Sequence, residues 1–302
     1  MRNATIEALY QAAEKDPRIV FITGDFQHVR EAEFRALGDR YQNAGMAEQN
    51  IVSVAAGMAL SGKKVFVFSI IPFITLRCIE QIKVDVCSHE ADVIVIGGGA
   101  GFTYGTCGIT HLAIEDIAMM RALPHMRIIS PSGPREAVAL FNQLITEKGP
   151  AYIRLNKRGE PDLTDRSPVL GKGLVVREGT DATIFSTGTI LAEALAAADI
   201  LNAKGISVEV VNMHTIKPLD EEIIRDRAIS RKFLCSLEEH NVIGGLGGAM
   251  AEVLAEVPHT AKFHRFGIPD AWPKVVGSQK FLRGAVGLSG EKVAEQILGF
   301  LA

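Results

Sequence analysis

The decapeptide D-V-I-V-I-G-G-G-A-G at residues 92–101 decides the fold, because it joins an unbroken apolar run to a cluster of glycines. A strand that is apolar on both faces is typical of a parallel sheet covered by helices on both sides. Further short β-rich runs lie at residues 19–23, 65–69, 127–129 and 151–154. Because helical patterns separate these runs, we expect a mostly parallel sheet inside a three-layer α/β/α domain.

The alternation of strands and helices continues through both halves of the chain. In the first half, the predicted helices cover residues 4–14, 48–60, 74–88, 114–123 and 134–147. In the second half we expect strands at 182–186, 207–211 and 232–237, and helices at 190–204, 220–227 and 247–256. Residues 156–172 are polar, contain Pro and Gly, and have no periodicity. We therefore predict two α/β domains, residues 1–165 and 166–302, each built around a mostly parallel sheet.

The composition argues against several classes of protein. A chain of 302 residues with 47% hydrophobic residues can bury two substantial cores. A net charge of -3 without any basic block argues against binding to nucleic acid or to a membrane surface. The sequence shows neither a signal peptide nor about 18 consecutive apolar residues, so we expect no membrane insertion. The cysteines form no C-x-x-C pair, which argues against a zinc site or a disulfide framework and favours a reducing, cytoplasmic location; we expect no metal ligands in this chain.

The glycines that follow residue 96 open a long loop that ends on a histidine. Residues 97–111 read G-G-G-A-G-F-T-Y-G-T-C-G-I-T-H, at a strand end where open parallel sheets bind ligands. His111 is a candidate for proton transfer or substrate binding, with an ordinary surface histidine as the alternative. The loop lacks the last glycine of the dinucleotide-binding fingerprint.

A second cluster of glycines, at residues 244–248, precedes a predicted helix. We interpret it as a tight turn, because no lysine or hydroxyl-bearing residue follows at the spacing of a P-loop. The alternative is a phosphate site on its backbone amides.

Glu48 lies shortly before residues 51–60, a stretch that contains no charged residue. A carboxylate at the start of an apolar helix can simply stabilise the positive end of the helix dipole. Phe68 and Phe73 follow in the chain and are either core residues or a flat apolar wall for a planar heterocycle.

Together these motifs resemble the transketolase family of thiamine diphosphate enzymes over nearly the whole chain. Residues 43–50, N-A-G-M-A-E-Q-N, resemble the pyrimidine-binding motif of the family. The later motifs occur in the family's order: F-x-x-x-R at 73–77, G-x-T-H-x-x-I-E-D at 108–116, M-R-x-x-P at 120–124, K-P-L-D at 217–220 and E-E-H at 238–240.

The resemblance implies roles for particular side chains. Glu48 would be catalytic, since the family's glutamate hydrogen-bonds the pyrimidine ring of thiamine diphosphate and thereby activates the cofactor. Phe73 would stack on that ring, with Asp25 and Arg77 also at the cofactor. His111 would be the second catalytic residue and would hydrogen-bond the oxygens of the substrate.

The substrate side departs from the family pattern. Cys107 occupies a position where the family usually has an acidic residue that reads a sugar hydroxyl, and a thiol is a weak acceptor. Gly99 and Val29 replace a histidine and a serine-like residue that are common in members acting on sugar phosphates. Arg158 is the candidate contact for a substrate phosphate. These departures predict ketol transfer with an unusual donor or acceptor sugar.

The sequence contains no G-D-G motif, with which a separate domain of the family binds the diphosphate and its divalent metal. The chain therefore resembles the C-terminal half of a split transketolase. We expect an N-terminal partner subunit that carries G-D-G and the ligands for Mg²⁺ or Ca²⁺, in a heterotetramer with two copies of each chain. The substrate would be a sugar or a sugar phosphate, and this chain alone would be inactive.

Two alternatives remain open at the level of the sequence. The chain could be the beta subunit of a 2-oxoacid dehydrogenase, which S-P-S-G-P at residues 130–134 resembles. It could also be a non-catalytic subunit that retains the fold.

Overall fold

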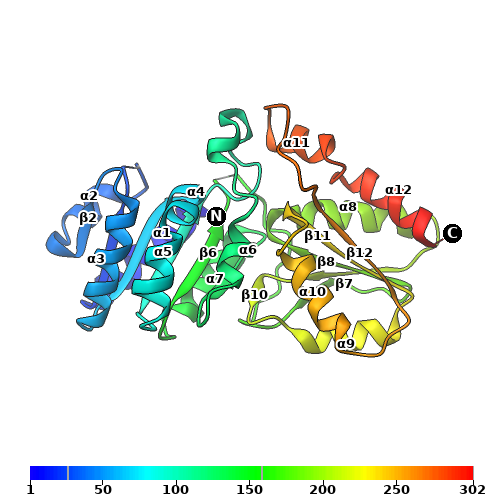
Figure 1. Ribbon diagram of the computed structural model, residues 1–302, viewed down its shortest axis with the longest axis horizontal. Coiled ribbons are helices and arrows are strands. Elements are labelled where there is room, and N and C mark those ends of the chain that lie inside the picture. Colours follow the sequence, from blue (N-terminus) through cyan, green and yellow to red (C-terminus); the bar gives the residue numbers. More distant parts are fainter. Residues whose placement is uncertain (26, 158, 302) are drawn as a thin grey trace.

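The computed structural model describes residues 1–25, 27–157 and 159–301, in which two sheets lie side by side (Figure 1). The first sheet has the strand order β10-β5-β6-β4-β3-β1-β2. Its strands are β1 (Ile19–Thr23), β2 (Tyr41–Asn43), β3 (Lys64–Ile70), β4 (Val93–Gly98), β5 (Arg127–Ile129), β6 (Ala151–Leu155) and β10 (Thr215–Lys217). All neighbours are parallel except β10, which runs antiparallel to β5.

The second sheet has the order β12-β11-β8-β9-β7. It consists of β7 (Leu174–Arg177), β8 (Ala182–Thr187), β9 (Val208–Asn212), β11 (Phe233–Asn241) and β12 (Lys262–Ile268). Here only β7 is antiparallel to its neighbour. The predicted α/β class with two mostly parallel sheets is therefore confirmed.

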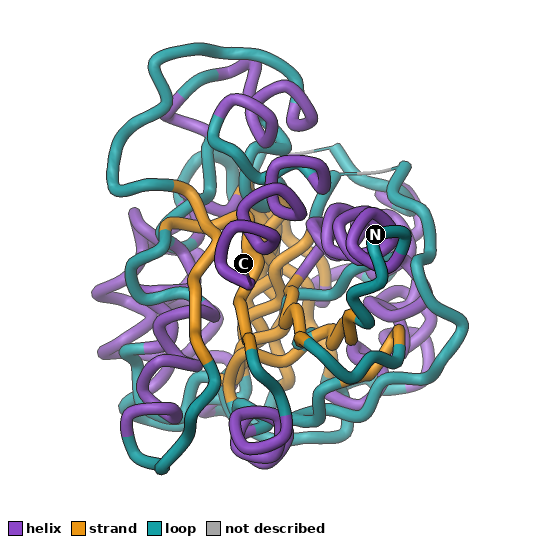
Figure 2. The backbone as a smooth tube through the Cα atoms, turned by 90° about the vertical axis from the view of Figure 1, so that its right-hand side faces the viewer, coloured by secondary structure: helices purple, strands orange, loops and turns teal. Residues whose placement is uncertain are grey.

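Helices cover both faces of each sheet, so that strands occupy the middle and helices lie on either side when the molecule is viewed along its length (Figure 2). On the first sheet, one face packs against α1 (Arg2–Lys15) and α7 (Pro134–Leu144). The other face packs against α3 (Glu48–Leu60), α4 (Ile71–Ile74), α5 (Ile79–Gln81) and α6 (Asp116–Arg121).

The second sheet is covered in the same way. One face packs against α8 (Leu191–Asn202) and α12 (Gly290–Leu301), and the other against α9 (Glu221–Ser230) and α10 (Leu246–Ala255). Two short helices, α2 (Glu31–Arg35) and α11 (Gln279–Ala285), complete the set. Within the described residues, no helix combines the length and the apolar character that a membrane span requires.

The structure differs from the prediction most clearly between residues 71 and 87. The single helix predicted over 74–88 is wrong, because this segment is divided into α4, a 3-10 turn (Leu76–Cys78), α5 and a π-helical turn (Ile82–Cys87). The chain leaves helical geometry at Thr75, which has φ -111° and ψ -77°. Arg77 lies in the 3-10 turn that follows this break.

Several elements were not predicted: β2, β7, β10, β12, α2, α11 and α12. All four strands lie at sheet edges, where one side of the strand has no neighbour and the apolar run is short. β10 belongs to the second half of the chain yet pairs with β5 of the first sheet. The division of the chain between residues 165 and 166 stays a prediction.

Candidate active site

The predicted site residues gather where the strands of the first sheet have their carboxyl ends. β4, β3 and β1 are adjacent and parallel, so their carboxyl ends lie together. Gly24 and Asp25 follow β1, Ser69 lies near the end of β3, and the loop that carries His111 follows β4. The sheet topology therefore places residues that are far apart in sequence around a common point.

Glu48 is the first residue of α3 and is only 3% exposed. Its Oε1 accepts a hydrogen bond from Ser69 Oγ at 3.0 Å, and its Oε2 accepts one from Arg77 Nη1 at 2.7 Å. Gly24 lies against the same group, because a Cβ there would be 3.3 Å from Ser69 Oγ and 3.5 Å from Glu48 Oε1. A buried carboxylate is stable only when its charge is paired and its oxygens are hydrogen-bonded. Ser69 and Arg77 meet this requirement and hold the carboxylate in one orientation.

Phe73 connects Glu48 with the histidine loop. The guanidinium carbon of Arg77 lies 4.5 Å from the centre of the Phe73 ring, within the range of a cation–π contact. On another side, the rings of Phe73 and His111 meet edge to face, with 5.2 Å between their centroids and 73° between their planes. The half-buried Phe73 ring thus joins the buried carboxylate to His111 in a single cluster.

The loop after β4 is closed at its base by two backbone hydrogen bonds between Gly101 and Ala113, at 3.0 and 3.1 Å. Within it, Cys107 lies exposed on a 3-10 turn, and His111 Nδ1 is 2.9 Å from Thr110 Oγ1. His111 is partly exposed, so its other ring nitrogen can face a ligand.

Tyr104 was not singled out from the sequence, yet its ring lies between Gly99 and His111 in this loop. A Cβ at Gly99 would collide with the Tyr104 ring, which explains why no larger residue stands at position 99. The same ring lies 6.2 Å from the His111 ring, and Lys157 Nζ lies 5.4 Å from its centre. An aromatic residue in a glycine-rich loop is the signal that could have identified it.

The other predicted residues are distributed differently. Asp25 is exposed at the end of β1, next to Gly24. Phe68 is fully buried in the core between the first sheet and α7, which agrees with a packing role. Arg158 lies outside the described residues. Ser69, which the sequence reasoning missed, follows the apolar run 65–68 directly, and a hydroxyl at the end of such a strand was the available signal.

Gly244 and Gly245 form the turn that leads into α10, and Gly247 and Gly248 lie in the first turn of that helix. Glu238 occupies this turn: its carboxylate accepts hydrogen bonds from the Leu246 and Gly247 amides at 2.7 and 2.8 Å. A Cβ at Gly245 would collide with that carboxylate. Burial raises the pKa of Glu238 to about 7. These contacts support the tight-turn interpretation, since a side chain of the protein already occupies the amides that a phosphate would use.

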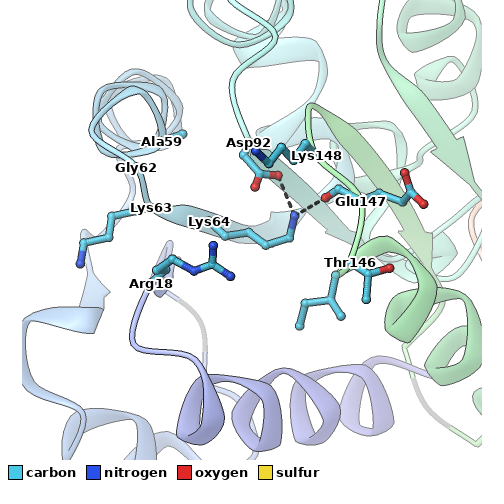
Figure 3. A pocket seen from close by; sticks show the side chains of 10 residues that line it. Arg18, Ala59, Gly62, Lys63, Lys64, Asp92, Thr146, Glu147 and Lys148 are labelled. Atoms are coloured by element: carbon cyan, nitrogen blue, oxygen red, sulfur yellow. Dashed lines mark hydrogen bonds and ion pairs between the residues drawn. The ribbon is translucent and has the colours of Figure 1, made fainter.

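A cavity of about 320 Å³ lies at the other end of the strands, where β3 begins. It is lined by Arg18, Lys63, Lys64 and Lys148, among others (Figure 3). Lys64 Nζ donates to Asp92 Oδ1 at 2.7 Å and to the Glu147 carbonyl at 2.6 Å. Lys64 is the first residue of β3, and Ser69 lies five positions further along the same strand. At a rise of about 3.3 Å per residue, the two residues are about 17 Å apart. This cavity is therefore distinct from the Glu48 cluster.

The fold and the site together define the class of protein. Residues 1–160 match the family described as transketolase, pyrimidine binding domain, and residues 171–293 match transketolase, C-terminal domain. The chain belongs to the transketolase family. Of the two domains just named, the first carries Glu48, Phe73 and His111.

Relatives that cover nearly the whole length of the chain include subunits of transketolases. The 6-deoxy-6-sulfo-D-fructose transketolase subunit SqwH of a Clostridium species is 35% identical, with 97% of this chain and 92% of that protein covered. A subunit of the apulose-4-phosphate transketolase of Actinobacillus succinogenes is 34% identical, with 99% and 97% covered. A solved structure described as a split gene transketolase, inactive beta4 tetramer, is 33% identical and superposes with a TM-score of 0.87 over 99% of this chain and 96% of that chain. These relatives favour a transketolase subunit over the 2-oxoacid dehydrogenase and non-catalytic alternatives.

Proposed function

We propose that this chain is the C-terminal subunit of a two-chain transketolase that transfers a two-carbon ketol unit from a ketose donor to an aldehyde acceptor. The observation that carries the proposal is the buried Glu48 carboxylate, held by Ser69 and Arg77 beside the Phe73 ring. A carboxylate at the carboxyl ends of parallel strands lies where such sheets bind ligands, so it is placed to exchange a proton with a bound group.

The residues present fit the heterocyclic part of thiamine diphosphate. Phe73 offers an aromatic face, Glu48 offers a carboxylate as hydrogen-bond acceptor, and Gly24 keeps the approach to that carboxylate free of a side chain. When bound, thiamine diphosphate supplies a stabilised carbanion, which ketol transfer requires. Glu48, Phe73, Arg77 and, nearby, Asp25 would be the residues of this chain at the cofactor.

The residues of the chain then have separate tasks. Ser69 and Arg77 fix the orientation of Glu48, whose oxygens each have a second lone pair for a donor on a ligand. The Nδ1 atom of His111 faces Thr110, so Nε2 would donate a proton to, or accept one from, a substrate oxygen. Phe73 meets the His111 ring edge to face and would help to fix its position.

We propose that the diphosphate and its Mg²⁺ or Ca²⁺ are bound by an N-terminal partner subunit with a G-D-G motif. In the described residues, no three His, Cys, Asp or Glu side chains form a group that could hold a metal ion, and the sequence has no G-D-G. The relative described as an inactive beta4 tetramer supports the idea that this kind of subunit does not work alone. We place the complex in the cytoplasm as a heterotetramer with two copies of each chain, in agreement with four free cysteines.

Reconstitution tests this proposal. The chain is purified alone and together with the G-D-G subunit, and ketol transfer is measured with thiamine diphosphate and Mg²⁺. We expect activity, and thermal stabilisation by the cofactor, only in the mixture. Production of aldehyde from a ketose would separate this reaction from decarboxylation of a 2-oxoacid, and an active isolated chain would contradict the proposal.

We further propose that the donor or acceptor is an unusual sugar. Tyr104 fills the space at Gly99, and the exposed Cys107 offers a thiol where a strong acceptor is common, so the substrate side differs from that of enzymes for ordinary phosphosugars. The Clostridium relative is named for a sulfonated fructose. A donor screen decides the point, and Arg158→Ala shows whether that residue contacts a substrate anion. Turnover of xylulose 5-phosphate with ribose 5-phosphate at ordinary transketolase rates would refute an altered specificity.

A further inference from the structure

The loop that carries Cys107 and His111 is part of the first half of the sequence but packs into the core of the second. Phe102, Leu112 and Ile114 are buried in the same apolar cluster as residues of α8 and α12. In Figure 1 the segment after β4 rises above the first sheet and faces α11. The position of the loop therefore depends on the second sheet and its helices as well as on β4.

A single carboxylate joins this loop to α11. Glu239, in β11, is 4% exposed, and its Oε1 accepts a hydrogen bond from the Phe102 backbone amide at 2.5 Å. Gln279 Nε2 donates to both carboxylate oxygens at 2.9 and 3.0 Å, and Arg283 Nε donates to Oε2 at 2.6 Å. Hydrogen bonds to a charged acceptor are shorter and about twice as strong as neutral ones. Glu239 is thus bound on one side by the loop and on the other by α11.

Two glycines allow the loop to approach this closely. Gly101 has φ +57°, and a Cβ there would collide with the Glu239 carboxyl group. At Gly105 a Cβ would lie 2.5 Å from the Gly277 carbonyl oxygen, and the Gly277 amide donates to the Gly105 carbonyl at 3.3 Å. The loop is therefore held at two points that precede Cys107 and His111. One is the polar contact between Phe102 and Glu239, and the other is the close packing of Gly105 against Gly277.

We propose that the second domain positions the substrate loop, with Glu239 as the positioning residue that holds His111 against Phe73. Glu239 acts through the Phe102 amide and the base of the loop, and it does not contact the substrate itself. The identity of the loop as the substrate side rests on the proposed function. The Glu48 carboxylate is held by other residues, Ser69 and Arg77, so its orientation does not depend on Glu239 and we expect the cofactor still to bind when this contact is lost.

Hydrogen–deuterium exchange on the isolated chain tests the contact without any activity. Glu239→Gln keeps the size of the side chain but removes the negative charge that pairs with Arg283 and accepts hydrogen bonds from Phe102 and Gln279. Gly105→Ala introduces a methyl group between the loop and Gly277 and leaves the buried charge intact, so it serves if the first variant does not fold. We expect both variants to exchange amides 99–111 faster than the wild type. Gly284→Ala in α11 is the matched control, since a Cβ at that position would have no described atom within 4 Å, and it should exchange like the wild type.

Kinetics in the assembled complex provide the second readout. For Glu239→Gln and Gly105→Ala we expect kcat/KM for the sugar to fall by about tenfold or more, with unchanged affinity for thiamine diphosphate. Wild-type exchange in both variants, or a loss of cofactor affinity in parallel with activity, would overturn the proposal. If the wild-type complex lacks ketol transfer, the proposed function fails, while the exchange experiment still decides whether Glu239 holds the loop.

Discussion

The hydroxyl of Ser69 offers the sharpest test of the candidate site. Replacing Ser69 with Ala removes one of the two donors to Glu48 and changes the volume of the side chain by a single oxygen atom. Both residues are buried, with Ser69 4% and Glu48 3% exposed, so water has little access to take the place of the hydroxyl. The remaining donor, Arg77, has a side chain that is 45% exposed, and solvent screens its ion pair.

The magnitude of the effect follows from this geometry. A hydrogen bond to a charged group contributes about 1.5–3 kcal/mol. If the orientation of Glu48 matters in the transition state, this range corresponds to a fall in kcat of about 10-fold to 150-fold, at 1.36 kcal/mol for each factor of ten. The binding of the sugar should change little, because the hydrogen bond that Ser69 Oγ donates goes to Glu48 Oε1.

The assay compares Ser69→Ala with Ser53→Ala in the reconstituted complex by steady-state kinetics. Ser53, also on α3, donates to Asp85 Oδ2 at 2.6 Å on the exposed surface of the protein. The same chemical change there should alter stability by less than about 0.5 kcal/mol and leave kcat unchanged. Wild-type kcat for Ser69→Ala, or equal losses for both variants, would refute the reasoning.

Three further outcomes are expected. Glu48→Gln keeps the shape of the side chain but cannot exchange a proton, so kcat should fall by at least about 100-fold while the complex still assembles on size-exclusion chromatography; retained activity would exclude a catalytic role. Asp116→Asn weakens the buried ion pair with Arg154, whose Nε lies 2.8 Å from Asp116 Oδ2, and should lower the free energy of unfolding by about 3–5 kcal/mol in denaturant titrations; a change below about 1 kcal/mol would contradict this. Burial lowers the pKa of His214 to about 4, so its contribution to stability is complete above about pH 6.5 and is lost as the pH falls towards 4. Between pH 6.5 and pH 4, the free energy of unfolding should fall by about 3 kcal/mol less in His214→Asn than in the wild type. Identical pH profiles of the two proteins would show that the histidine is not responsible.

The sequence was most informative where a local pattern has one physical cause. Runs that are apolar throughout, such as 93–96, occur because both faces of a parallel strand are covered, and the sheets are parallel as predicted. The edge strands β2, β7, β10 and β12 were missed because a strand with a neighbour on one side only is less completely covered. Its sequence therefore lacks a long apolar run. The helix predicted over 74–88 was wrong because its residues have helical spacing, whereas the chain breaks at Thr75 and continues in 3-10, α and π turns.

The candidate site shows the same division. Glu48, Phe73 and His111 were selected from the sequence, and the structure brings them together at the carboxyl ends of β1, β3 and β4. Ser69 and Tyr104 were missed because a serine and a tyrosine are common, and only their neighbours in space show what they contact. Glu239 lies 137 positions from Phe102, a separation that no periodicity along the chain can reveal.

By itself, the sequence determined the α/β class, the acidic residue at the start of an apolar helix and the absence of a G-D-G motif, because each of these is a property of residues close together in the chain. The tertiary structure decided which donors hold Glu48, how Tyr104 fills the space at Gly99, and that the base of the His111 loop contacts Glu239 of the second sheet. These features depend on parallel strands aligning their carboxyl ends and on burial, which makes every unpaired polar group costly. Such constraints arise only once the chain has folded.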